Sequence, residues 1–210
     1  MIATLALCPG LDTIPVCQLF LCCVDAVAFK FVNIHFIKHW LKNPAAVGAI
    51  APSSLHLARA MAQPADQFDT IIELGAGTGV ITDALIERNP SARLIAFELD
   101  PALAGKLAAR HPGIEVVAGC FHERAQILDS LPERALIVSA LPFRSLPKEV
   151  IRPTTVILAR FLMQNVGRRL VQFTYQPRTP FDVPTSLTWR WRRVIWRNTP
   201  PAGVWELRQG

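Results

Sequence analysis

The sequence predicts an α/β protein built on a doubly wound, mostly parallel sheet of seven strands that ends in an antiparallel hairpin. Short apolar segments rich in β-branched residues alternate with helical segments from residue 69 onward, which is typical of a parallel sheet covered on both faces. A glycine-rich loop, "ELGAGTGV", follows the first of these segments. Near the C-terminus, two segments rich in tryptophan and arginine flank "TPPA" and predict the hairpin.

Bulk composition limits the number of domains and the class of partner. With 210 residues, 51% of them hydrophobic, the chain can bury one substantial core and is expected to form one domain. The formal net charge of +6 favours a polyanionic partner, either nucleic acid or an anionic membrane. The five cysteines have neither zinc-ligand spacing nor a disulfide framework, so we expect reduced thiols and no metal site.

Residues 1–28 are apolar but contain no lysine or arginine, so they lack the basic start of a secretory signal. Their uninterrupted apolar stretches are too short to span a bilayer. Three interpretations are open: a membrane-seeking leader, a disordered tail, or a start-site artefact that precedes the true start. We favour the last two. No other stretch suits a transmembrane helix, so any membrane association is expected to be peripheral.

Residues 29–43 predict an amphipathic helix, because apolar residues recur at intervals of three and four. This stripe consists of Phe29, Val32, Phe36 and Trp40. Lysines and a histidine fill much of the remainder. The helix is expected either to pack its stripe onto the core or to lie in a membrane interface, with its basic side toward lipid headgroups.

The main domain, which we take as residues 44–210, is expected to begin with a helix at 51–62. Ser53 or Ser54 can cap this helix, since a serine hydroxyl accepts hydrogen bonds from the free amides of a first turn. Short β-branched segments and longer amphipathic segments then alternate. Strands are predicted over 69–74, 92–100, 113–119 and 134–142, and helices over 79–89, 101–111 and 123–131.

The C-terminal part of the domain has a looser pattern. A helix is predicted over 154–166 and a strand over 168–176. The segment 177–185 is rich in proline and is expected to be a loop. Strands over 186–198 and 203–209 complete the antiparallel hairpin.

The glycine-rich loop after the first strand is the first candidate ligand site. Gly75, Gly77 and Gly79 allow the backbone to approach a ligand without intervening side chains. In a doubly wound sheet, ligands bind at the carboxyl ends of the strands, where this loop lies. The spacing is GxGxG rather than the GxGxxG that cradles a pyrophosphate, and the lysine of a P-loop is missing. A phosphate-rich cofactor is therefore disfavoured.

Two carboxylates refine the identity of this ligand. Glu98, at the end of the next strand, can accept hydrogen bonds from both hydroxyls of a ribose. Glu73, just before the loop, can face an ammonium group or cap the loop amides. A ligand with a ribose and an ammonium group but no phosphate points to S-adenosylmethionine.

The segments "ELGAGTGVIT" and "AFELD" resemble the nucleotide-binding half of class I S-adenosylmethionine-dependent methyltransferases, which have a Rossmann-like fold. This resemblance covers roughly residues 66–145. It implies cofactor contacts from the loop glycines and both carboxylates, and further contacts from Leu99, Cys120 and Phe121.

Four flanking segments resemble one branch of these enzymes, the bacterial phospholipid N-methyltransferases, which methylate phosphatidylethanolamine. The segments are "WLKNPAAVGAIAPSSLHLARAMA", "SALPFRSLP", "LVQFTYQP" and "VIWRNTPPAGVWEL". The resemblance runs from about Phe36 to Leu207. It implies an aminophospholipid substrate, an anionic membrane surface as partner, no nucleic-acid partner, and a cytoplasmic location on the inner face of the membrane.

In amino-methylating relatives, a turn of the type Asn-Leu-Pro-aromatic after the fourth strand aims carbonyl oxygens at the amine. Here the turn reads "ALPF". By this resemblance, Ser139 and Ala140 offer carbonyls and Phe143 offers a π-face to a developing cation. Tyr175, the only tyrosine, either holds the headgroup or packs in the core.

Arg144 is our candidate for binding lipid phosphate. The arginines of the last strands are interpreted mostly as a solvated basic face; they are Arg190, Arg192, Arg193 and Arg197.

Two departures from the family pattern stand out. Relatives often carry an acidic residue that bonds the adenine amino group where this chain has Cys120. Arg168 and Arg169 replace a glycine pair, which we interpret as a changed loop without functional consequence. Three alternative functions stay open: an RNA adenine N6-methyltransferase, an ornithine-lipid N-methyltransferase, and an inactive cofactor-binding relative. Cys120 and Ala140 are the residues that favour the last.

Overall fold

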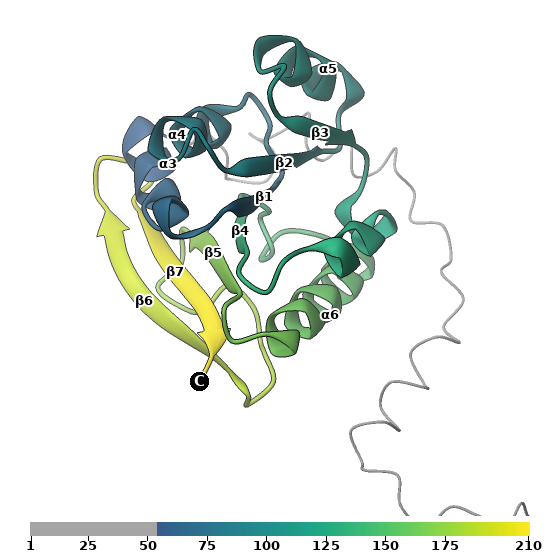
Figure 1. Ribbon diagram of the computed structural model, residues 1–210. Helices are drawn as coiled ribbons and strands as arrows, with labels where there is room; N and C mark the ends of the chain where they lie inside the picture. The colour runs from purple at the N-terminus through teal and green to yellow at the C-terminus, as the bar shows by residue number, and fades with distance from the viewer. Residues whose placement is uncertain (1–53) are drawn as a thin grey trace, which may run out of the picture. The chain divides into compact units, whose positions relative to one another are not determined.

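A computed structural model describes residues 54–210, so the predictions for residues 1–28 and for the helix at 29–43 lie outside the described residues. The described part contains a seven-stranded sheet in the order β3-β2-β1-β4-β5-β7-β6, with helices on both sides (Figure 1). The first five strands pair in parallel, whereas β7 runs antiparallel to both β5 and β6. The predicted fold class, with its terminal hairpin, is confirmed.

The elements follow the predicted order. The strands are β1 (Thr70–Leu74), β2 (Arg93–Glu98), β3 (Glu115–Ala118), β4 (Leu136–Ser139), β5 (Arg169–Thr174), β6 (Leu187–Ile195) and β7 (Ala202–Gln209). The α-helices are α3 (Leu55–Ala62), α4 (Val80–Arg88), α5 (Pro101–Arg110) and α6 (Lys148–Gln164). Residues 54–210 also contain three short 3-10 segments, η2 (Ala65–Gln67), η3 (Phe121–Glu123) and η4 (Ala125–Ser130).

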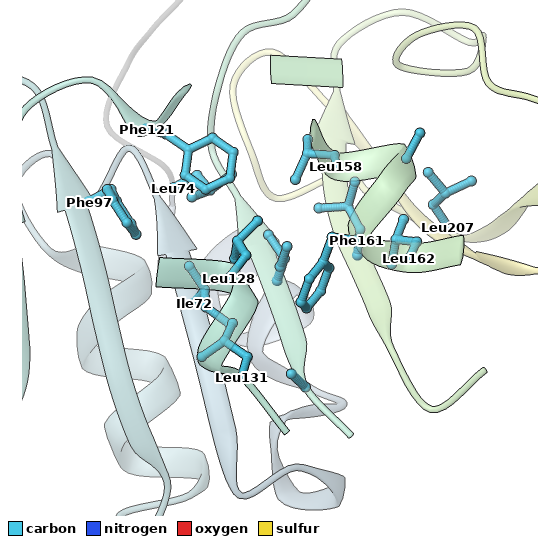
Figure 2. Close-up of a cluster of buried hydrophobic side chains, with 14 of the residues drawn as sticks. Ile72, Leu74, Phe97, Phe121, Leu128, Leu131, Leu158, Phe161, Leu162 and Leu207 are labelled. Atoms are coloured by element: carbon cyan, nitrogen blue, oxygen red, sulfur yellow. The ribbon is translucent and has the colours of Figure 1, made fainter. Parts of the chain in front are cut away.

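The central strands β1 and β4 are buried along their whole length because both of their faces are covered. Ile72 and Leu74 of β1 point to one side, where Phe161 and Leu162 of α6 meet them with η4 (Figure 2). Ile71 points to the other side and packs with residues of α3 and α4. This arrangement fixes the carboxyl ends of β1, β2, β4 and β5 along one edge of a rigid sheet.

Two predicted elements differ in the structure. The sequence predicts one helix over 123–131, but the chain forms the 3-10 segments η3 and η4 there, since Pro132 ends the run and only Leu128 and Leu131 of this stretch are fully buried. Helix α6 begins at Lys148 rather than at residue 154 and contains Pro153. Burial of Val150 keeps the first turn on the core in spite of the proline.

Helix α3 is capped by Ser54, one of the two predicted caps, whose hydroxyl accepts a hydrogen bond from the Leu57 amide at 3.2 Å. The Ser54 amide in turn donates to the Asn198 side chain at 3.0 Å. The start of α3 is therefore fixed to the turn between β6 and β7.

Arg168 joins three segments of the core. Its guanidinium donates to the carbonyls of Leu131 (3.1 Å) and Phe161 (3.1 Å), to the Pro132 carbonyl (3.3 Å) and to the Gln164 side chain (2.7 Å). It also lies 4.1 Å from the centre of the Phe161 ring. Burial lowers its pKa from the ordinary value. The residue that replaces a family glycine thus has a structural role that the sequence did not reveal.

Candidate active site

The glycine-rich loop connects β1 to α4, and its glycines differ in their structural roles. The amides of Gly75 and Ala76 donate to the Phe97 carbonyl at 2.9 and 3.0 Å, which fixes the loop to β2. Gly79 has a φ of +84°, and a Cβ there would lie 2.6 Å from the Leu107 side chain of α5. Gly77 has a φ of +56°, and no atom lies within 4 Å of its Cβ position. Gly77 is therefore open to a ligand, whereas Gly79 is needed for packing.

Glu98 shapes this loop from the end of β2. Its carboxylate is 5% exposed and accepts the amide of Gly77 at 2.7 Å and the amide of Asp100 at 2.8 Å. Each carboxylate oxygen has a further lone pair, so Glu98 can still accept hydroxyl donors from a ribose. Leu99 follows it and is partly buried.

Glu73 is a buried carboxylate, 1% exposed, whose side chain points toward α4. The Thr82 hydroxyl donates to one of its oxygens at 2.6 Å, while the other oxygen has no partner among residues 54–210. Burial raises the pKa of Glu73 to about 7; the nearby Asp83 and Glu98 carboxylates act in the same direction, and the Thr82 hydrogen bond opposes them. A buried acceptor without a partner fits the ammonium group of S-adenosylmethionine.

Replacing Glu73 by glutamine is expected to change how stability depends on pH. In the folded protein without cofactor, the pKa of Glu73 is about 7, against an ordinary value of 4.5. The stability that Glu73 contributes is therefore complete below pH 4.5 and is lost as the pH rises through 7. The free energy of unfolding of the native protein, relative to Glu73→Gln, should fall by up to about 3 kcal/mol across this range. Urea denaturation of both proteins at a series of pH values measures this difference in the free energy of unfolding. A difference that does not change with pH would contradict the prediction.

The segment after β3 holds Cys120 and Phe121, two of the expected cofactor contacts. Burial raises the pKa of Cys120 to about 11, so its thiol is neutral, and its sulfur lies 3.0 Å from Nδ1 of His122. Phe121 is buried and packs edge-to-face on Phe97 with ring centres 5.3 Å apart (Figure 2). The side chain of Phe121 thus belongs to the core, while the partly exposed Cys120 lies just before it.

The turn after β4 lies beside the cofactor loop. The Ala140 amide donates to the Leu74 carbonyl at 2.9 Å, and the Leu141 amide donates to the hydroxyl of buried Ser139 at 3.2 Å. The Leu141 side chain lies 3.2 Å from the Cβ position of Gly75. The Ala140 carbonyl accepts no hydrogen bond from any described residue, so it is available to a donor.

Gln172 of β5 was missed as a site residue. It is 1% exposed and pairs with Ser139 across the two parallel strands. Its side-chain amide donates to the carbonyls of Leu141 (2.9 Å) and Phe173 (2.8 Å), whereas its side-chain oxygen has no partner in the described chain. A polar residue in the apolar strand "RLVQFT" was the signal that could have revealed it.

The remaining candidates lie farther from this cluster. Phe143 is buried and packs on Phe181, with ring centres 4.7 Å apart. Arg144 is exposed and donates to the Thr179 carbonyl. Tyr175 packs on the α3 and α4 side of the sheet; burial raises its pKa, and a hydrogen bond with Asn198 opposes this shift. The structure therefore brings together Glu73, the loop, Glu98 and the turn, but places Phe143 and Tyr175 in opposite core layers.

Within residues 54–210, no group of three or more histidine, cysteine, aspartate or glutamate side chains could hold a metal ion. No helix in the same range is long and apolar enough to cross a membrane.

Comparisons with known proteins identify the family. No protein-family profile matches the chain. The chain is 31% identical over 193 residues to the ornithine lipid N-methyltransferase of Singulisphaera acidiphila, a likeness that covers 82% of this chain and 94% of that protein. It is 32% identical over 128 residues to the dimethyladenosine transferase of Schizosaccharomyces pombe, covering 58% of this chain and 36% of that one.

Among solved structures, the 23S rRNA methyltransferase ErmE shares the fold, with a TM-score of 0.50 and 20% identity over 73% of this chain and 67% of that chain. The likeness to the S. acidiphila protein reaches far beyond the shared cofactor-binding half. The chain therefore belongs to the class I methyltransferases that use S-adenosylmethionine as methyl donor, in the family of the ornithine lipid N-methyltransferase.

Proposed function

We propose that the protein is a phospholipid N-methyltransferase that methylates the amine of phosphatidylethanolamine, and of its methylated derivatives, at a membrane surface. The observation that carries this proposal is the extent of its likeness to a lipid N-methyltransferase, which covers 82% of this chain and 94% of that protein. The likeness to the dimethyladenosine transferase covers only 36% of that protein. An ornithine lipid, which also carries an amine, is the second candidate substrate.

Several residues would hold the cofactor in this proposal. Glu73 would accept a hydrogen bond from the ammonium group, Glu98 would accept the ribose hydroxyls, and the open backbone at Gly77 would lie against the ligand. Leu99 and Cys120 would complete the nucleoside side. When bound, S-adenosylmethionine supplies an electrophilic methyl group, whose bond to sulfur breaks as the new bond to nitrogen forms.

The turn after β4 would orient the amine. The carbonyls of Ser139 and Ala140 would accept its N–H groups and leave the nitrogen lone pair directed at the methyl group. Partial burial lowers the pKa of an amine, so the neutral form that transfer needs becomes more populated. The proton released by the product passes to solvent. Arg144 and Tyr175 remain candidates for contacts to the phosphate and the headgroup.

The proposed location is the inner face of the cytoplasmic membrane, with peripheral attachment. The net charge of +6 suits an anionic surface. The helix predicted at 29–43 would add an interfacial anchor.

Methyl transfer from radiolabelled cofactor tests the function. Purified full-length protein would be offered phosphatidylethanolamine or an ornithine lipid in anionic vesicles, or bulk RNA. We expect label in the phosphatidylethanolamine fraction. Label in the ornithine lipid alone would change the substrate, and label in RNA alone would refute a lipid enzyme.

Replacing Gln172 by leucine supplies a matched variant for this assay. Loss of the bond to the Leu141 carbonyl frees the turn, so we expect the transfer rate to fall at least about tenfold while cofactor affinity is unchanged. Gln126→Leu, at an exposed position of η4, is the control and should leave both unchanged. An unaltered rate in Gln172→Leu would show that the turn does not depend on this side chain.

A further inference from the structure

A groove of about 430 Å³ runs between α3 and the end of β6, and we call it the α3–β6 groove. Its lining contains three arginines, one histidine and no aspartate or glutamate. The lining residues are His56, Arg59, Ala60, Gln63, Arg193, Val194, Ile195, Trp196 and Arg197. Arg59 forms an exposed ion pair with Glu87 at 3.5 Å, and such a pair offsets the positive charge only weakly in water.

Hydrogen bonds at both ends of α3 join the helix to the β6–β7 hairpin and so fix the two sides of the groove. On α3, His56, Arg59 and Gln63 recur at helical spacing on the outer side, while Leu57 and Met61 are buried in the core. The hydrogen bond between Ser54 and Asn198 fixes one end of the helix to the turn that follows β6. At the other end, the guanidinium of Arg192 bonds both Gln63 and the buried Glu206 of β7.

Apolar side chains lie beside the arginines of the groove. Trp196 is 77% exposed, and Leu55 at the start of α3 is 65% exposed. Val194 and Ile195 add aliphatic surface to the groove. A tryptophan mixed with arginines is typical of membrane interfaces, where the indole ring lies at headgroup level and guanidinium groups meet lipid phosphates. Proteins that bind single-stranded nucleic acid instead use aromatic side chains on which successive bases stack, and Trp196 is the only phenylalanine, tyrosine or tryptophan in this lining.

The groove lies at the edge of the sheet that also carries the candidate active site. Because β7 is antiparallel to both β5 and β6, strand β6 runs parallel to β5. Gly203 of β7 pairs with Thr174 on one side and with Val194 on the other. The carboxyl end of β6 therefore lies at the same edge of the sheet as the cofactor loop and the turn after β4.

We propose that the α3–β6 groove is a docking surface for anionic phospholipid in a bilayer. Arg193 and Arg197 contact lipid phosphates, and Trp196 enters the headgroup region. These two arginines thus have a specific partner rather than forming only a solvated basic face. The proposal deepens the proposed function and rests on it, since a lipid substrate must be reached at a membrane.

Vesicle binding by the full-length chain tests this surface. The double variant Arg193→Glu with Arg197→Glu is compared with the native protein on vesicles of equal parts phosphatidylcholine and phosphatidylglycerol. We expect the partition coefficient to fall at least about tenfold, while the affinity for S-adenosylmethionine is unchanged. Trp196→Ala should also weaken binding, and it should do so without a change in net charge.

A matched control carries the same charge change elsewhere. Arg152 and Arg160 are exposed on α6, which covers the opposite face of the sheet from α3, so Arg152→Glu with Arg160→Glu should retain vesicle binding. An equal loss of vesicle binding in the two double variants, or no loss in either, would overturn the proposal that the α3–β6 groove is a docking surface. Loss of RNA binding alone in the groove variant would also overturn it, in favour of RNA. A native protein that binds vesicles but methylates no aminolipid would refute the proposed function and leave the docking result intact.

Discussion

Replacing Glu98 by alanine is expected to weaken the binding of S-adenosylmethionine at least about 100-fold, because two kinds of charge-assisted hydrogen bond are lost together. The carboxylate holds the amides of Gly77 and Asp100 at 2.7 and 2.8 Å. The same group is the proposed acceptor for the ribose hydroxyls. Without it, the loop loses its shape and the nucleoside loses its partner.

Isothermal titration of the cofactor into Glu98→Ala measures this effect. Glu115→Ala is the matched control, because Glu115 is exposed on β3 and forms an ion pair with Arg93 at 3.0 Å, away from the loop. The control should bind the cofactor as the native protein does. Equal affinities in the two variants would exclude Glu98 from the cofactor site.

Replacing Arg168 by methionine is expected to lower the free energy of unfolding by about 3 kcal/mol. The substitution leaves the carbonyls of Leu131 and Phe161 without a donor in positions that are closed to water. Methionine approximates the length of the aliphatic stem, so lost hydrogen bonds rather than a large cavity dominate the change.

Urea denaturation of Arg168→Met compares it with Arg160→Met, which removes an exposed charge from the same region of the chain. We expect the control to retain native stability. Methyl transfer per folded molecule should be the same in both, because Arg168 contacts neither the cofactor loop nor the turn. A loss of stability that is equal in the two variants would show that Arg168 is not a specific support.

The sequence predicted the features that depend on neighbours along the chain. The strand, loop and helix around Gly77 form a local unit, and Glu73 and Glu98 lie at strand ends that any parallel sheet brings together. The alternation of apolar strands with amphipathic helices therefore sufficed to predict the sheet and the edge of the sheet at which Glu73, the loop and Glu98 lie.

The features that it did not predict depend on pairing between distant segments. Gln172 reaches the turn only because β5 lies beside β4, and Arg168 reaches Leu131 only because α6 and η4 share one face of the sheet. Tyr175 follows β5 directly, yet strand alternation turns it away from the layer that contains Phe143. A single sequence shows neither these registers nor these orientations.

The contact between Leu141 and Gly75 has a consequence for the evolution of such enzymes. The turn that would orient the acceptor and the loop that would orient the donor touch through one side chain and bare backbone, with 3.2 Å between the Leu141 methyl and the Cβ position of Gly75. If the turn and the loop bind acceptor and donor as proposed, the scaffold itself would set the distance over which the methyl group travels. Residues farther out can change to suit another headgroup or another amine while that distance is preserved, so one catalytic frame can serve chemically different acceptors.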